Sequence, residues 1–179
     1  MKQALLIIAL CACVATTSVD ARRHDNHRNR NERTEHVRGH RCGGQYFVDG
    51  RHVFFDGHEV KDASASSFRI LRDGYAKDAW NAYHNGHKIK GASSASFKAL
   101  GEGYAGDAWN VYYYGTKIKK ASRNNFKILG QGYAKDAWNV YYKGRKIDGA
   151  SASSFRVLRD GYAKDAWNSF HHGRKISGR

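Results

Sequence analysis

The octapeptide GYAKDAWN occurs at Gly74–Asn81, Gly132–Asn139 and Gly161–Asn168, and its variant GYAGDAWN occurs at Gly103–Asn110. These blocks contain all four tryptophans of the 179-residue chain, and each tryptophan follows the previous one by 29 residues. A short tandem period of this kind is typical of a repeat architecture. Four copies of one surface favour a multivalent or structural protein over an enzyme, which usually needs one asymmetric group of catalytic residues.

The period extends beyond the tryptophan blocks in both directions. A shift by one period places Tyr75 on Tyr46, so a degenerate first unit starts near Gln45 and has Arg51 where later units have tryptophan. We therefore expect a repeat domain over residues 45–179 with five units: the degenerate one, three full ones and a last one cut short after Ile176. Terminal repeats are expected to depart from the consensus because one of their faces lacks a neighbour.

Each unit has the pattern of a β-hairpin followed by a short connection. The segment Asn110–Tyr114 is rich in β-branched and aromatic residues, which favour strands. An x-Gly pair then predicts a type I′ turn, as in Asp56-Gly57 and Asn85-Gly86. Between hairpins, segments such as Ala121–Leu129 predict one short helical turn entered through a serine cap. In these segments the phenylalanines are expected to fill the gap between hairpins: Phe68, Phe97, Phe126 and Phe155.

The predicted fold class is mainly β: tandem 29-residue repeats of a β-hairpin plus a short helical turn, forming a stacked or propeller-like all-β repeat domain. Alternation along the strand predicts that Trp109, Val111 and Tyr113 face the core. Tyr112 and Tyr114 would then face outward. On this interpretation the repeat core anchors are Trp80, Trp109, Trp138 and Trp167. Exposed platforms for sugars or anions are the alternative role for these side chains.

One aspartate precedes each Ala-Trp pair: Asp78, Asp107, Asp136 and Asp165. One carboxylate per unit is too few for a calcium ion, which takes ~6–8 oxygen ligands. We therefore expect each aspartate to accept backbone N–H bonds at the turn before the strand.

The repeat pattern resembles the DKNYY repeat family. The resemblance rests on Tyr-x-x-Asp-x-x-x-Val-Tyr-Tyr-x-Gly-x-x-Ile followed by Ala…Phe-x-x-Leu, and it is closest at Tyr104–Ile118 and Tyr133–Ile147. The chain departs from the family's name-giving motif because Ala-Trp replaces the usual lysine-containing turn. The resemblance implies a repeat fold of secreted or surface proteins and no defined activity. A weaker likeness to hemopexin-type repeats is limited to the aromatic strand, the glycine turn and the Ala…Phe segment.

The first 21 residues have the layout of a secretory signal peptide, with an apolar run at Ala4–Val14 and cleavage expected after Ala21. The run is shorter than the ~20 apolar residues of a membrane span. We therefore expect a secreted, extracellular protein without a membrane span. Cys42 is then the only cysteine of the mature chain. A disulfide-linked homodimer through Cys42 and an unpaired thiol without a role are the two alternatives.

Residues 22–44 carry seven arginines and four histidines with almost no apolar residue, which predicts a disordered basic arm. The arm could bind polyanions, be a removed propeptide, or be a solvated leader. Positive charge recurs at seven repeat positions, which predicts a charged stripe, with a surface charged for solubility as the alternative. Three of these lysines lie within the octapeptides, Lys77, Lys135 and Lys164, and one follows each turn in the last four units. The candidate polyanion-binding residues are Lys88, Lys117, Lys146, Lys175, Arg22, Arg23, Arg28 and Arg30.

The sequence contains no phosphate-binding glycine loop, zinc-protease motif or nucleophile elbow, so we expect neither enzymatic activity nor a cofactor. The formal net charge of +15 favours an anionic partner: acidic polysaccharide, mineral or another anionic matrix surface. Our main hypothesis is a secreted, non-enzymatic structural protein of an extracellular matrix or biomineral. The alternatives are a carbohydrate- or cell-surface-binding module, which requires exposed tryptophans, and a cationic host-defence protein that acts through the arm.

Overall fold

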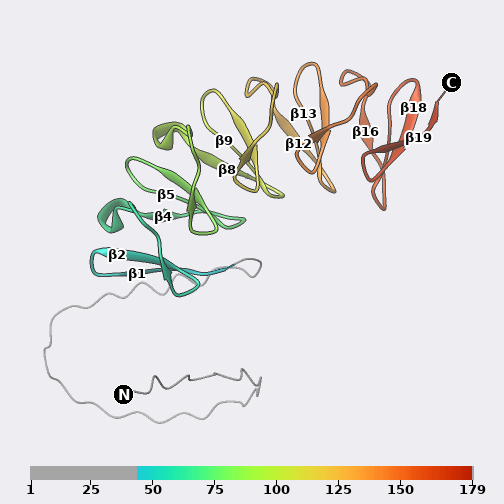
Figure 1. Ribbon diagram of the computed structural model, residues 1–179. Coiled ribbons are helices and arrows are strands. Elements are labelled where there is room, and N and C mark those ends of the chain that lie inside the picture. The colour runs from blue at the N-terminus through green and yellow to red at the C-terminus, as the bar shows by residue number, and fades with distance from the viewer. Residues whose placement is uncertain (1–43, 179) are drawn as a thin grey trace, which may run out of the picture. The chain divides into compact units, whose positions relative to one another are not determined.

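A computed structural model describes residues 44–178, which form five small antiparallel sheets in tandem (Figure 1). The predicted signal peptide, nearly all of the basic arm and Cys42 lie outside the described residues. No helix in the described part of the chain has the length and apolar character needed to cross a membrane. The mainly β repeat fold predicted from the sequence is confirmed.

The five sheets follow one another in chain order. The first sheet contains β1 (Tyr46–Asp49), β2 (His52–Phe55) and β3 (His58–Glu59). The second contains β4 (Arg69–Ile70), β5 (Tyr75–Lys77), β6 (Ala82–His84) and β7 (His87–Lys88). The third contains β8 (Lys98–Gly101), β9 (Tyr104–Gly106), β10 (Val111–Tyr113) and β11 (Thr116–Lys117). The fourth contains β12 (Lys127–Gly130), β13 (Tyr133–Lys135), β14 (Val140–Tyr142) and β15 (Arg145–Lys146). The fifth contains β16 (Arg156–Val157), β17 (Tyr162–Lys164), β18 (Asn168–His171) and β19 (Arg174–Gly178).

The x-Gly pairs form the predicted tight turns. In the third sheet Tyr114 has φ 43° and Gly115 has φ 75° between the paired strands β10 and β11. Two consecutive positive φ angles are the signature of the type I′ turn, whose twist matches that of the flanking strands. The same pair of angles recurs in every sheet, including at Lys143, a residue that rarely adopts it.

The connections between sheets differ in part from the prediction. Short 3-10 helices form at η1 (Ala65–Ser67) and η2 (Ser94–Ser96), but their serine caps make no side-chain hydrogen bond to the helix. The Phe-x-x-Leu segments that follow are extended, not helical: β8 pairs with β9, so each later sheet takes its first strand from the end of the preceding unit. Pairing with the tyrosine strand satisfies backbone groups that a single helical turn would leave free.

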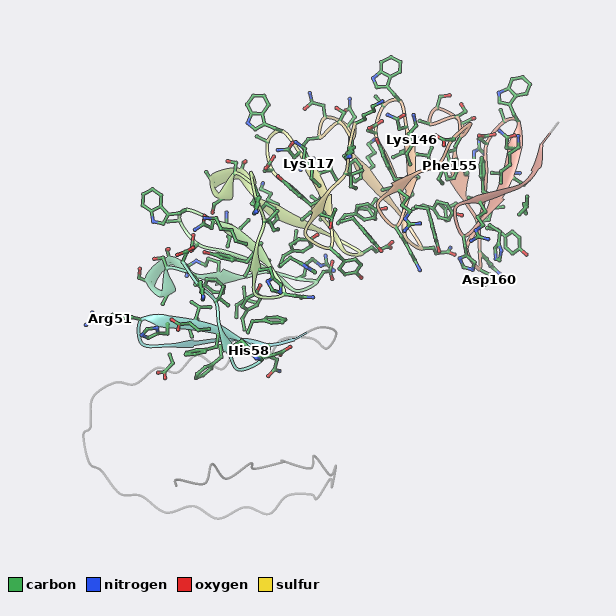
Figure 2. All side chains as sticks on the ribbon, viewed as in Figure 1. Arg51, His58, Lys117, Lys146, Phe155 and Asp160 are labelled. Carbon is green, nitrogen blue, oxygen red and sulfur yellow. The ribbon has the colours of Figure 1, made fainter. Side chains whose placement is uncertain are left out.

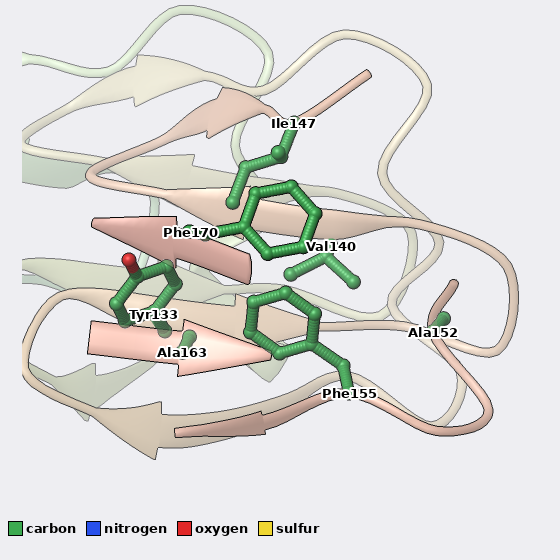
Figure 3. Close-up of a cluster of buried hydrophobic side chains, with 7 residues drawn as sticks. All are labelled: Tyr133, Val140, Ile147, Ala152, Phe155, Ala163 and Phe170. Carbon is green, nitrogen blue, oxygen red and sulfur yellow. The ribbon is translucent and has the colours of Figure 1, made fainter. Parts of the chain in front are cut away.

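Neighbouring sheets share their cores, so the central strands are buried on both faces. Tyr104 and Val111 pack with residues of the fourth sheet, whereas Ala105 and Tyr112 pack with residues of the second. The outward orientation predicted for Tyr112 is therefore wrong, because one-sided alternation does not apply to a strand between two sheets. Figure 3 shows the core between the fourth and fifth sheets, where Phe155 fills the gap as predicted.

Tyrosine hydroxyls join consecutive sheets by hydrogen bonds. The Tyr104 hydroxyl donates to the carbonyl oxygen of Gly132 (3.0 Å) and accepts from the N–H of Gly144 (3.0 Å). Tyr75 and Tyr133 make the same two bonds to the sheets that follow them. Each of these tyrosines therefore contributes both its ring to a shared core and its hydroxyl to the next backbone.

Candidate functional site

The loop between the two central strands is organised by one buried aspartate in each of the last four sheets. Asp107 is 1 % exposed, and its Oδ1 accepts the N–H of Trp109 (2.8 Å) and of Asn110 (2.7 Å). Its Oδ2 accepts the N–H of Ser93 (3.0 Å) and the hydroxyl of Tyr112 (2.9 Å). Asp78 and Asp136 have corresponding partners. The structural role predicted for these aspartates is confirmed.

These hydrogen bonds keep the aspartates ionised. Burial opposes ionisation of Asp107, but the N–H groups of Ser93, Trp109 and Asn110 outweigh it, so the pKa of this carboxyl lies below its ordinary 3.8. The balance has the same direction at the other three positions: Asp78, Asp136 and Asp165.

We expect the repeat domain to lose stability in acid. A carboxyl whose pKa is lower in the folded than in the unfolded chain stabilises the fold above the unfolded value, and this contribution disappears as the pH falls through the folded value. The urea midpoint, followed by circular dichroism, should therefore be level near neutrality and fall below about pH 4. The decline should persist at high salt, which screens repulsion between the many surface cations. A constant midpoint down to about pH 2 would contradict this assignment.

The tryptophans are exposed. Exposed fractions are 79 % for Trp80, 79 % for Trp109, 81 % for Trp138 and 66 % for Trp167. The prediction that they anchor the core is wrong, because each lies in a loop before the strand begins, where the alternation of strand side chains does not hold. Buried tyrosines and phenylalanines fill the cores instead. Figure 2 labels Arg51, which has the same repeat position, at the tip of the first sheet's loop and away from His58.

The recurring lysines after the turns are exposed and lie on edge strands. Each is the second residue of its strand in the second to fifth sheets: Lys88, Lys117, Lys146 and Lys175. Figure 2 shows Lys117 and Lys146 in neighbouring sheets. By contrast, Lys77 and Lys135 within the octapeptides donate to the carbonyl oxygens of Ser94 (3.0 Å) and Ala152 (2.7 Å). The edge lysines are thus free to meet an anion, whereas these two octapeptide lysines hold the next connection.

Two shallow depressions lie between neighbouring sheets. One of about 280 Å³ adjoins the Trp138 loop and is lined in part by Lys127, Lys135 and Ser153. No sequence pattern predicts this depression, because its lining residues come from two connections and one octapeptide. The other, of about 510 Å³, is at the hairpin turns. It includes His84, whose buried Nε2 has no hydrogen-bond partner among the described residues.

Several predicted site residues lie outside the described residues: Arg22, Arg23, Arg28, Arg30 and Cys42. Within residues 44–178, no group of three or more histidine, cysteine, aspartate or glutamate side chains could hold a metal ion. The arrangement that the described residues offer is therefore a row of exposed aromatic rings on rigid loops with lysines on the adjoining strand edges.

Comparison with known proteins identifies a family. Residues 46–175 match the family model described as the DKNYY family. Neither the curated proteins nor the solved structures include a match to this chain.

Proposed function

The chain belongs to the DKNYY family, and we propose that it is a secreted, non-enzymatic structural protein of the extracellular matrix whose repeats hold an extended acidic polymer, acidic polysaccharide above all. The observation that carries this proposal is the exposure of one tryptophan on each of four consecutive sheets. Single exposed apolar residues are ordinary on protein surfaces, but the same exposed aromatic ring at one loop position of four consecutive sheets forms a repeated surface suited to a partner.

The tryptophan loops are suited to binding because they are rigid before a ligand arrives. Asp107 fixes the backbone N–H groups of Trp109 and Asn110, and the neighbouring sheets fix Asp107 through Ser93. Little backbone entropy is then lost when a ligand contacts the ring. A flat indole face suits the apolar face of a sugar ring, while its N–H group suits a hydroxyl.

The repetition favours a long ligand over a small molecule. Stacked sheets lie ~10 Å apart, so successive rings are separated by more than one sugar unit. One polymer that crosses several sheets converts each further contact into an intramolecular event. The lysines at the second position of β7, β11 and β15 add one positive charge per sheet, which favours acidic over neutral polymers.

A second candidate function is a discrete carbohydrate- or cell-surface-binding module. The depression beside the Trp138 loop favours it, because a concave site can enclose a short ligand. The two functions differ in their dependence on ligand length. A short oligosaccharide should saturate a discrete module at full affinity, whereas affinity for the matrix protein should rise with polymer length until four rings are occupied.

We expect polymer affinity to follow the number of tryptophans. Trp138→Ala should weaken binding to an immobilised sulfated polysaccharide about tenfold, or 1.4 kcal/mol, because one of four stacking contacts is removed. Arg51→Trp should strengthen binding by a smaller factor, because it adds a fifth ring at the same repeat position but also removes one positive charge. Quenching of tryptophan fluorescence and retention on the polymer at fixed salt measure both effects.

Tyr114→Asn is the matched control for loss of an exposed aromatic ring. Tyr114 is 52 % exposed at a hairpin turn, and Asn85 occupies the same turn position in the second sheet. This variant should keep the full affinity. Unchanged binding after replacement of all four tryptophans by alanine would disprove the proposed site and would leave the lysines and the basic arm as the source of affinity.

A further inference from the structure

The last sheet exposes the face that every inner sheet uses to hold its successor. Tyr133 is 0 % exposed and Ile147 is 6 % exposed under the fifth sheet. The residues at the same repeat positions in the fifth sheet, Tyr162 and Ile176, are 45 % and 56 % exposed. Leu158, which directly follows β16 and donates its N–H to the carbonyl oxygen of Tyr162, is also exposed, at 44 %. We call this apolar surface of Leu158, Tyr162 and Ile176 the trailing face.

The first sheet exposes the opposite half of the same interface. Ala105 and Tyr112 turn toward the preceding sheet and are fully buried. Their repeat positions in the first sheet hold Phe47, which is 61 % exposed, and Phe54, which is half-buried. Phe47 and Phe54 are paired directly across β1 and β2. We call this surface the leading face.

From these two surfaces we propose that copies of this chain associate head to tail, with the trailing face of one copy on the leading face of the next. The contact continues the interface that already joins the five sheets, so the partner is a second copy of this chain. The proposal goes beyond the proposed function, because it requires no polysaccharide. A contact between two different faces does not close after one dimer, so its repetition gives either a larger ring or an open filament.

Backbone groups at the two faces are complementary as well. Inside the array, Tyr133 donates to the Gly161 carbonyl oxygen (2.9 Å) and accepts the Gly173 N–H (2.9 Å). Tyr162 has the repeat position of Tyr133, and Gly57 has the repeat position of Gly173. The hydroxyl of Tyr162 and the N–H of Gly57 lack a hydrogen-bond partner among the described residues. Seating one copy on the next would pair them.

The leading face also has space for an aromatic ring. At each inner hairpin turn, that space is occupied by a ring from the preceding sheet. A Cβ atom on Gly173 would lie 2.6 Å from the Cβ of Tyr142, because the preceding sheet's ring covers that turn. At Gly57, by contrast, nothing lies within 4 Å of such an atom. His171 has the repeat position of Tyr142 and stacks on Tyr162 (4.2 Å between ring centroids), so it would cover Gly57 of the next copy.

The side-chain volumes compensate each other at this junction. Each inner junction contains a phenylalanine from the connection, such as Phe126 between the third and fourth sheets, and an alanine at the position of Ala134. The trailing face, formed by Leu158, Tyr162 and Ile176, contains no such phenylalanine. The leading face instead has Phe47 at the alanine position, which can fill the space that the missing ring leaves.

The test uses the mature chain with its thiol kept reduced, so that no disulfide through Cys42 contributes. Sedimentation velocity should show a mass-average mass that rises with protein concentration. Tyr162→Glu and Phe47→Glu should each abolish this rise, because either change places a charge in an apolar contact. An equimolar mixture of the two variants should form dimers and nothing larger, since each retains one intact face.

Two controls make the result specific. Trp167→Glu changes an exposed aromatic residue of the fifth sheet outside both faces and should leave association intact. Ile176→Glu is a second change on the trailing face, which replaces Tyr162→Glu if circular dichroism shows that the latter misfolds. A wild-type chain that stays monomeric at all concentrations would overturn the proposal. So would loss of association in only one of the two face variants, or a mixture that remains monomeric.

Discussion

Asp107→Ala should destabilise the repeat domain by about 3–4 kcal/mol, among the largest effects of any single substitution in this chain. The change removes a buried carboxylate that accepts hydrogen bonds from three backbone N–H groups and one tyrosine hydroxyl. Hydrogen bonds to a charged group contribute more than neutral ones, and buried donors left without an acceptor pay their full desolvation cost. The urea midpoint at neutral pH, measured by circular dichroism, gives the loss directly.

Two further variants define the cause of that loss. Asp148→Ala removes an exposed carboxylate with no described hydrogen bond and should change stability by less than about 0.5 kcal/mol. Asp107→Asn should give an intermediate loss, because one amide oxygen can still accept the N–H groups of Trp109 and Asn110 while the amide nitrogen opposes Ser93. A fully stable alanine variant would show that the loop does not depend on its carboxylate.

Tyr104→Phe should cost about 1–3 kcal/mol although only one oxygen atom is removed. Its hydroxyl bridges Gly132 and Gly144 of the following sheet, and phenylalanine leaves both of these backbone groups without a partner. In a repeat array, stability is a sum of unit and neighbour contributions, so a weakened junction also reduces cooperativity. Hydrogen exchange should show the sheets before and after this junction opening separately.

Tyr162→Phe is the control for this effect, because Tyr162 has the same repeat position but no sheet follows it within residues 44–178. At protein concentrations low enough to keep the chain monomeric, this substitution should leave the unfolding midpoint unchanged. Equal losses in both variants would mean that the hydroxyl acts within its own sheet and not across the junction.

Features that depend on residues close together in the chain were predictable from the sequence, but the hydrogen bonds between sheets were not. The x-Gly pairs predicted the turns because their backbone angles depend on adjacent residues. The aspartates were assigned correctly because their loop partners lie two or three residues away. The phenylalanine that fills each gap followed from its position between two hairpins.

The tryptophans were misassigned because the period of two was counted backward from Val111 through a loop to Trp109. The tyrosine hydroxyl bonds join residues 28 and 40 positions apart, so no local pattern contains them. Their only trace in the sequence is that Tyr104 and its glycine partners recur together in each unit. The edge lysines were identified in the sequence. They could be distinguished from Lys77 and Lys135 only in the structure, where those two side chains donate hydrogen bonds to the next connection.

The sharing of each core between one sheet and the next also bears on how such a chain can change its length. Because a junction uses the same residue positions each time, insertion or deletion of one 29-residue unit alters no type of contact. Duplication of a gene segment would then lengthen the protein in fixed steps, and each step would add one tryptophan loop and one edge lysine. The number of tryptophan loops can therefore change by whole units while the residues at every junction stay the same.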